Sequence, residues 1–212
     1  MKKSIVITGG SSGIGLELVH YYLKKNNTVY TTYLKSKKEL IKLKQMHKEN
    51  LFFKKMDLGS DKDITNFLKI IQRHSNSVDI IVLNALNNVK RKKFIKIKKK
   101  EIIKSLSKNF LGNFFFLQML SKKILIKNEV RVLHISSIVS KKGSWGLSAY
   151  GPVKAAVDNL FKCLQYEFKN KIKFKSIYLS AVDTKGYRYT NGLKKVYKTI
   201  KTKKAISKII GT

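Results

Sequence analysis

Cysteine and proline are almost absent from this sequence, which contains one of each among its 212 residues. A single cysteine, Cys163, cannot form an intramolecular disulfide, so we expect a chain that folds without cross-links in a reducing compartment such as the cytoplasm. Because Cys163 lies in an apolar helical pattern, its thiol is predicted to be buried. Pro152 falls in the first turn of a predicted helix, where its missing N–H costs little.

Long apolar runs are also missing. The longest, such as 114–117, fall far short of the roughly 20 residues that span a bilayer. Residues 1–4 enter a strand-like segment at once, which leaves no room for a signal peptide. With 43% hydrophobic residues and no Pro- or Gly-rich boundary, the sequence predicts one folded domain over 1–212 and no membrane span.

Acidic residues are scarce: the chain has 12 Asp and Glu against 46 Lys and Arg, a net charge of +34. A surface this basic attracts nucleic acid non-specifically, and a nucleic-acid binder is one rival hypothesis. However, only four of the basic residues are arginines, whose planar fork is what dedicated base and phosphate readers use. Because the lysines are dispersed along nearly every predicted helix, we interpret them as a general compositional bias and expect no specific nucleic-acid partner.

Short apolar or β-branched runs alternate with longer amphipathic ones, which is typical of βαβ units and a parallel sheet. The predicted strands are 4–8, 28–33, 51–56, 80–83, 130–135 and 172–179. The predicted helices are 13–25, 37–47, 62–73, 98–124, 149–168 and 203–210. Right-handed crossovers between such units give a single doubly wound α/β domain, with sheet order 3-2-1-4-5-6 and helices on both faces.

A glycine-rich turn, TGGSSGIG, follows the first predicted strand directly. Its glycines permit a tight turn, a close approach of backbone to a pyrophosphate, and close packing of helix on strand. The N–H groups and dipole of the next helix then point toward the phosphates. A glycine cluster alone can be a simple turn, but its place between strand and helix favours a dinucleotide site in a Rossmann-type cofactor half, about residues 1–90. The residues expected at this site are Thr8, Gly9, Ser11, Ser12, Gly13, Ile14 and Gly15.

The end of the second predicted strand bears on the choice of dinucleotide. A site that prefers NAD usually has an acidic residue there to hold the ribose hydroxyls. This chain has Tyr33, followed two residues later by Lys35, which can pair with a 2′-phosphate. NADP is therefore expected in preference to NAD, although a lysine near any position is unsurprising in this chain.

A second motif lies on the predicted helix that begins near residue 149. Tyr150 and Lys154 have YxxxK spacing, and Tyr150 lies 13 residues after Ser137, which follows the predicted strand 130–135 closely. Together with the TGGSSGIG turn, they resemble the motifs of the short-chain dehydrogenase/reductase family over about residues 4–184. The resemblance implies an NAD(P)-dependent oxidoreductase that acts on a small carbonyl or alcohol substrate, with its catalytic and substrate half at about 91–212.

The spacing of Tyr150 and Lys154 suits proton transfer. One helical turn separates them, so their side chains share a face. A nearby ammonium favours the phenolate, so we expect the pKa of Tyr150 to be lowered from about 10 toward the working pH. Tyr150 can then give a proton to a carbonyl oxygen during reduction, or take one during alcohol oxidation.

The resemblance also implies roles for further residues. Lys154 is expected to hold the nicotinamide ribose, Ser137 to bind the substrate oxygen, and Asn109 to position a water that links the lysine to solvent. Asp57 is expected to contact adenine, although it can equally be a turn residue at a strand end. The remaining expected cofactor contacts are Leu58, Asn84, Ala85, Val182 and Thr184.

Two expectations concern the surroundings of the site. The loop 185–193 and Trp145 are expected to wall the substrate pocket. Helices 98–124 and 149–169 carry apolar faces that in this family usually pair two subunits, so a homodimer or larger homo-oligomer is expected.

Three departures from the family pattern bear on activity. Leu86 stands where the family usually has a glycine close to the cofactor, and 179–180 is Leu-Ser where Pro-Gly is usual. The sequence ends at residue 212, where typical members continue into a last strand, so the sheet is expected to lack it. A catalytically idle nucleotide-binding regulator is therefore the alternative, against which the intact catalytic motif counts.

The four histidines, His20, His47, His74 and His134, lie far apart, without the spacing of metal ligands. No metal site is expected, and surface or strand positions are predicted for each. Neither paired carboxylates nor a Ser-His-Asp order stands out among the twelve acids.

Overall fold

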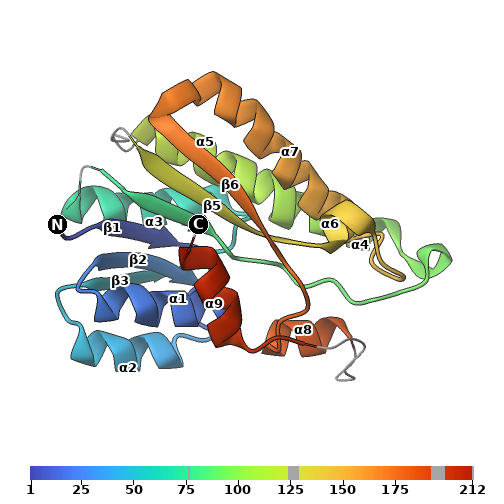
Figure 1. Ribbon diagram of the computed structural model, residues 1–212, viewed down its shortest axis with the longest axis horizontal. Coiled ribbons are helices and arrows are strands. Elements are labelled where there is room, and N and C mark those ends of the chain that lie inside the picture. The colour runs from blue at the N-terminus through green and yellow to red at the C-terminus, as the bar shows by residue number, and fades with distance from the viewer. Residues whose placement is uncertain (76, 124–128, 192–198, 212) are drawn as a thin grey trace.

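Six parallel strands form one sheet in the computed structural model of the protein (Figure 1). The structure describes residues 1–75, 77–123, 129–191 and 199–211. The strand order is β3-β2-β1-β4-β5-β6, which confirms the order predicted from the sequence. The strands are β1 (Ser4–Ile7), β2 (Thr28–Tyr33), β3 (Leu51–Lys55), β4 (Ile80–Leu83), β5 (Val130–Ser137) and β6 (Ile172–Leu179).

Helices cover both faces of this sheet (Figure 1). The helices of one face are α1 (Gly13–Lys24), α2 (Lys38–Met46) and α9 (Thr202–Ile210). Those of the other face are α3 (Asp61–His74), α5 (Gly112–Lys123) and α7 (Gly151–Phe168). The shorter helical segments are η1 (Phe94–Lys96), α4 (Lys99–Leu106), α6 (Val139–Lys142), η3 (Lys169–Lys171) and α8 (Lys185–Thr190). The doubly wound architecture is therefore confirmed.

The central strands bury both of their faces because helices cover each. In β1, Ile5 and Ile7 belong to the core that includes α1 and α9, while Val6 between them belongs to the core that includes α3 and α5. All three side chains are fully buried. Each such burial contributes roughly 1.5–3 kcal/mol, and near-continuous apolar strands of this kind are typical of parallel sheets.

The long helix predicted over 98–124 is observed as a continuous helical run from Lys99 to Lys123 that contains one π-helical turn, and residue 124 lies outside the described residues. α4 ends at Leu106, a π-helical turn occupies Ser107–Leu111, and α5 then begins at Gly112. Backbone hydrogen bonds in a π-helical turn reach one residue further than in an α-helix. The carbonyl of Asn109 in this turn accepts a hydrogen bond from Asn113 Nδ2, at 2.7 Å. The π-helical turn is thus bonded to a side-chain amide, and periodicity alone does not reveal it.

Cys163 is exposed, so the prediction of a buried thiol is wrong. The buried apolar residues of α7 include Val153, Val157 and Phe161. Cys163 follows Phe161 by two positions, which is about 200° around the helix. The thiol therefore lies on the solvent side of α7.

Beyond β6, the described chain pairs with itself at a single isolated bridge between Val182 and Ile200. The described ranges contain no seventh strand of the sheet. The segment predicted as a loop over 185–193 begins with α8, and its end lies outside the described residues. None of the described helices combines the length and hydropathy needed to cross a membrane.

Candidate functional site

A cleft of about 1730 Å³ runs along the carboxyl-terminal edge of the sheet. Open parallel sheets bind ligands at this edge, next to the point where the strand order reverses, here between β1 and β4. Residues that follow each of the six strands line the cleft. The predicted site residues among them are Gly9, Ser11, Ser12, Gly13, Ile14, Tyr33, Lys35, Asp57, Leu58, Asn84, Ala85, Ser137, Tyr150, Lys154, Val182 and Thr184.

The glycine turn needs backbone conformations that side chains disfavour. Gly9 and Gly13 have φ angles of +72° and +55°, in the left-handed region that glycine adopts at no steric cost. α1 begins at Gly13 and has no acidic residue in its first turn. The positive end of its dipole therefore meets the cleft without a neutralising side chain.

Two further glycines are required by packing. A Cβ at Gly15 would lie 2.3 Å from the carbonyl oxygen of Gly9, so Gly15 shapes the turn without itself lining the cleft. A Cβ at Gly10 would lie 2.1 Å from Thr31 Oγ1. The need for glycine at Gly10 could not be predicted from the sequence, because its neighbour on β2, Thr31, is brought close only in the folded chain.

The end of β4 is tied to the same turn. Thr8 Oγ1 accepts hydrogen bonds from the backbone N–H groups of Asn84, at 3.1 Å, and Ala85, at 3.0 Å. Thr8 is fully buried, so it holds the end of β4 in place without itself lining the cleft. Leu86, which stands where the family usually has a glycine, is among the residues that line the cleft.

Charged side chains follow β2 and β3. Tyr33 and the exposed Lys35 line the cleft as predicted. Asp57 forms an ion pair with Lys108 and also accepts from Gly59 N, at 3.0 Å. Partial burial acts to raise the pKa of Asp57, but these hydrogen bonds and the lysine charge outweigh it and hold the pKa below its usual value. Asp57 is thus an anion whose nearest partner is Lys108.

Ser137 at the end of β5 and Tyr150 before α7 both line the cleft, where the Ser137 hydroxyl accepts a hydrogen bond from Val139 N, at 3.2 Å. Burial raises the pKa of Tyr150 to about 12, and the nearby Ser137 hydroxyl opposes this only in part. The predicted lowering of this pKa is therefore wrong for the protein without a ligand. The phenol is a proton donor at neutral pH.

Lys154 lies almost fully buried one turn into α7, with its amine at the base of the cleft. Its Nζ donates to the carbonyl oxygen of Ile135, at 2.7 Å, and lies 3.2 Å from His134 Nε2. Burial lowers the pKa of Lys154 to about 8, while the carboxylate of Asp158 acts to raise it. At neutral pH the amine still carries its proton.

His134 and Asp158 are site residues that the sequence analysis missed. His134 Nδ1 lies 3.0 Å from Asp158 Oδ1, and Ser136 Oγ donates to Asp158 Oδ2, at 2.8 Å. Asp158 follows Lys154 by four positions, a spacing that could have placed both on one face of the helix. Within the described chain, no group of three or more His, Cys, Asp or Glu side chains is arranged to hold a metal ion.

Asn109 lies outside the cleft lining. Its Oδ1 accepts from Asn87 N, at 2.7 Å, and its Nδ2 donates to Asn87 O, at 3.0 Å. The side chain therefore fixes the segment that follows β4 and lies nearly fully buried. A water-holding role for Asn109 stays a prediction.

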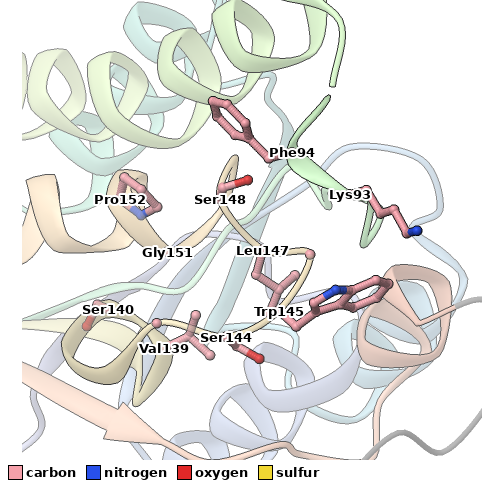
Figure 2. Close-up of a pocket in the computed structure, with 12 residues that line it drawn as sticks. Lys93, Phe94, Val139, Ser140, Ser144, Trp145, Leu147, Ser148, Gly151 and Pro152 are labelled. Carbon is pink, nitrogen blue, oxygen red and sulfur yellow. The ribbon is translucent and has the colours of Figure 1, made fainter. Parts of the chain in front are cut away.

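A second hollow, of about 540 Å³, adjoins the segment between β5 and α7. Figure 2 shows the side chains of Phe94, Trp145 and Pro152 around it. It shares Val139 and Leu147, among others, with the large cleft, but Tyr150, Ser137 and Lys154 do not line it. Trp145 therefore borders this hollow and is not among the residues that line the cleft with Tyr150 and Lys154, so the prediction that it walls that cleft is not confirmed.

Comparison with known proteins places the chain among oxidoreductases. The family model for short chain dehydrogenase matches residues 3–192. Benzil reductase ((S)-benzoin forming) of Bacillus cereus is 29% identical over 85% of this chain and 76% of its own length. The 3-oxoacyl-[acyl-carrier-protein] reductase FabG of Rickettsia prowazekii is 30% identical over 78% of this chain and 66% of its own. An uncharacterized oxidoreductase of Saccharomyces cerevisiae is 27% identical over 78% of this chain, and the match spans 52% of that relative.

Solved structures share the fold. The 3-ketoacyl-(acyl-carrier-protein) reductase from Brucella melitensis, complexed with NADH, gives a TM-score of 0.86 at 17% identity, over 98% of this chain and 89% of that one. A variant of ElxO with NADPH bound gives 0.77 at 26% identity, over 89% of this chain and 77% of that one. Because the family model covers most of the sequence and the sheet order agrees, the chain belongs to the short-chain dehydrogenase/reductase family of oxidoreductases.

Proposed function

We propose that the protein is an NADP(H)-dependent oxidoreductase that transfers a hydride between its nicotinamide cofactor and a small carbonyl or alcohol compound, with Tyr150 as the acid/base group. The observation that carries the proposal is that Tyr150, Ser137 and the nearly fully buried Lys154, one helical turn from Tyr150, converge on one cleft. All three groups line the same cleft as the residues of the glycine turn. This is the set of groups that proton transfer to a carbonyl oxygen requires.

The glycine turn fits a dinucleotide pyrophosphate. A Cβ at Gly13 would lie 3.3 Å from Thr184 Cγ2, so a side chain there would narrow the passage between α1 and the segment after β6. Ser11, Ser12 and the first N–H groups of α1 line this passage and would hold the phosphates. When bound, the cofactor supplies the hydride, and the protein supplies binding, orientation and the proton.

The protonation states favour reduction. With a pKa raised to about 12, Tyr150 keeps its proton at physiological pH and can donate it to a carbonyl oxygen. The Ser137 hydroxyl, which lines the same cleft, can bind the same oxygen. As Tyr150 loses its proton, the Lys154 ammonium stabilises the phenolate that forms. The curated relatives named above as reductases support the same direction.

The charges after β2 support NADP over NAD. Lys35 and Lys38 line the cleft, while Glu39, which also lines it, is paired with Lys42 at 3.7 Å. A Lys35→Glu variant should raise the Kd of NADPH about tenfold, equivalent to 1.4 kcal/mol, and change that of NADH much less. Titration calorimetry would measure both constants, with Lys62→Glu on α3 as a charge-matched control. Equal changes for the two cofactors would argue against a 2′-phosphate contact.

The activity is tested by following NADPH absorbance with the purified protein and a panel of diketones, ketones, aldehydes and 3-oxoacyl thioesters. Tyr150→Phe keeps the ring and removes the proton, and it should lower the rate about 100-fold or more. Full activity in this variant would remove Tyr150 from its role. Cofactor binding without turnover of any compound would favour the idle nucleotide-binding alternative.

We also propose that the protein forms a homodimer. A stripe of exposed apolar side chains follows one side of α4, the π-helical turn and α5. Its members are Ile103, Leu106, Leu111 and Phe115. Monomers rarely leave contiguous apolar surface uncovered, so a second copy of the chain is the proposed cover. A cytoplasmic location is proposed as well, since the only cysteine, Cys163, is an exposed free thiol.

A further inference from the structure

A buried cation and a buried anion lie one turn apart on α7, behind the cleft. Lys154 is 6% exposed and Asp158 is 8% exposed. Burying either charge alone is strongly unfavourable, so each must be compensated by partners inside the protein. Among the described side chains no direct ion pair joins these two. His134 of β5, which is 1% exposed, hydrogen-bonds to both of them.

The partners of His134 determine its tautomer. A lysine ammonium has only hydrogens to offer, so His134 Nε2, at 3.2 Å from Lys154 Nζ, must accept. The carboxylate of Asp158 has only lone pairs, so His134 Nδ1, at 3.0 Å, must donate. The imidazole is therefore neutral, with its proton on Nδ1. It connects anion to cation through two hydrogen bonds of fixed direction.

Further hydrogen bonds fix Lys154 and Asp158, the two ends of this hydrogen-bonded series. Lys154 Nζ also donates to Ile135 O, at 2.7 Å, and Asp158 also accepts from Ser136 Oγ, at 2.8 Å. An ammonium has three N–H bonds, and the described residues take up two of those of Lys154. The third is left for the cleft, which Lys154 lines.

Few other charges face the cluster. Tyr150 at the start of α7 and Tyr178 of β6 are the other titratable groups that interact with Asp158, and burial raises the pKa of both, so both are neutral near pH 7. Lys141 of α6 lies over the Tyr178 ring, 3.8 Å from its centroid. The Phe161 ring packs against the imidazole, with ring centroids 5.7 Å apart.

We propose that His134 and Asp158 are positioning residues for Lys154: the carboxylate provides the counter-charge, and the imidazole transmits it through hydrogen bonds that aim the remaining N–H of the lysine into the cleft. The direction of that N–H follows from the geometry of this chain alone. Its target, the ribose next to the nicotinamide, rests on the proposed function. Neither residue touches substrate or cofactor in this assignment, so both act through Lys154.

The protonation equilibria agree with this arrangement. Burial and the neighbouring ammonium of Lys154 lower the pKa of His134 to about 4, and the bond to Asp158 opposes this only in part. Burial lowers the pKa of Lys154 to about 8, and the carboxylate of Asp158 keeps it from falling further. Between these values the lysine is charged and the imidazole is neutral.

Heteronuclear NMR of labelled histidines tests the hydrogen bonds without cofactor or activity. His134, assigned by the loss of its signals in His134→Asn, should show a protonated Nδ1 and a bare Nε2 at neutral pH, and should titrate only near or below about pH 5. Lys154→Met removes the ammonium and should raise the pKa of His134, whereas Asp158→Asn should lower it. An imidazolium at neutral pH, or a proton on Nε2, would overturn the proposal.

Two variants separate the two hydrogen bonds of His134. The amide of Asn can replace Nδ1 as donor to Asp158, and the longer amide of Gln can replace Nε2 as acceptor for Lys154. If the whole chain of bonds positions the lysine, both His134→Asn and His134→Gln should lower kcat about tenfold. If the lysine contact alone matters, only the Asn variant should. Unchanged kcat in both variants would contradict a positioning role.

The pH profile distinguishes positioning from simple loss of stability. Asp158→Asn removes the anion that keeps Lys154 protonated, so the pKa of Lys154 should fall. The alkaline limb of the kcat profile, where Lys154 loses its proton, should therefore move about one pH unit lower. His74→Asn, at an exposed histidine of α3, should leave the profile where it is. An unmoved limb in Asp158→Asn would overturn the proposal. If the unmodified protein turns over no carbonyl compound, the proposed function fails, and the NMR result still decides the hydrogen-bonded arrangement.

Discussion

The side-chain amide of Asn84 binds the glycine turn directly: its Nδ2 donates to the carbonyl oxygen of Gly9, at 3.0 Å. The same nitrogen donates to the carbonyl of Thr8, also at 3.0 Å. Asn84 comes from the end of β4, so one amide connects the two strands at which the sheet order reverses. The backbone that would hold the cofactor phosphates is therefore fixed from the neighbouring strand before any ligand binds.

Asn84→Asp should release this turn. The substitution replaces a two-hydrogen donor by an acceptor that lies against two carbonyl oxygens, so two hydrogen bonds become repulsive contacts. The free energy of unfolding should fall by about 1–3 kcal/mol, and the Kd of NADPH should rise about tenfold or more. Urea unfolding and calorimetry would measure the two effects. A variant with both quantities unchanged would show that the turn holds its shape without Asn84.

Gly13→Ala and Gly143→Ala form a matched pair. Gly13 and Gly143 have φ angles of +55° and +67°, which side chains disfavour, so alanine at either should cost about 1–3 kcal/mol of stability. A Cβ at Gly13 would also approach Thr184 to 3.3 Å within the cleft, whereas a Cβ at Gly143 meets nothing within 4 Å. Only the Gly13 variant should therefore weaken NADPH binding, by about tenfold or more. Similar losses of affinity in both would point to a general effect of strain.

Acid should destabilise the protein through His134. Its pKa is about 4 in the folded chain against 6.5 ordinarily, so between these pH values the unfolded chain binds a proton that the folded chain does not. The free energy of unfolding should fall as the pH is lowered through this window, by on the order of 3 kcal/mol. The loss begins below about pH 6.5 and is complete near pH 4.

His134→Gln cannot titrate, so this part of the acid sensitivity should disappear in that variant. Urea unfolding at several pH values would measure it, with His74→Gln as the control that keeps the sensitivity. A variant that loses as much stability in acid as the unmodified protein would place the responsible group elsewhere. The low pKa of Asp158, about 2, acts only at more acidic pH.

The strand order was predictable because it depends on patterns that lie within single segments. Apolar runs such as 80–83 are buried wherever a doubly wound sheet places them, and a glycine turn after the first strand has few other uses. The helix over 98–124 was predictable from its apolar periodicity, but its π-helical turn was not, because that turn adds a residue without changing which side chains are apolar. The prediction of a buried Cys163 was wrong because apolar neighbours do not show which side of a helix packs against the sheet.

The candidate site was predictable as far as its motifs extend. Most of the predicted residues line one cleft because strand ends converge at one edge of a parallel sheet. His134 could not be found in this way, since its partners lie 20 and 24 residues away in the chain. The pKa of Tyr150 was mispredicted because its burial, which dominates, is a property of the folded protein.

Phe115 and Phe116 are adjacent on α5, but substitution by alanine should affect dimerisation at Phe115 and stability at Phe116. Phe116 is fully buried and Phe115 is 41% exposed within the stripe proposed to pair two subunits. Phe116→Ala should lower the free energy of unfolding by about 3–5 kcal/mol. Phe115→Ala should cost little in the monomer and shift the chain from dimer toward monomer, which analytical ultracentrifugation would measure. A Phe115 variant that dimerises as tightly as the unmodified protein would place the interface on another surface.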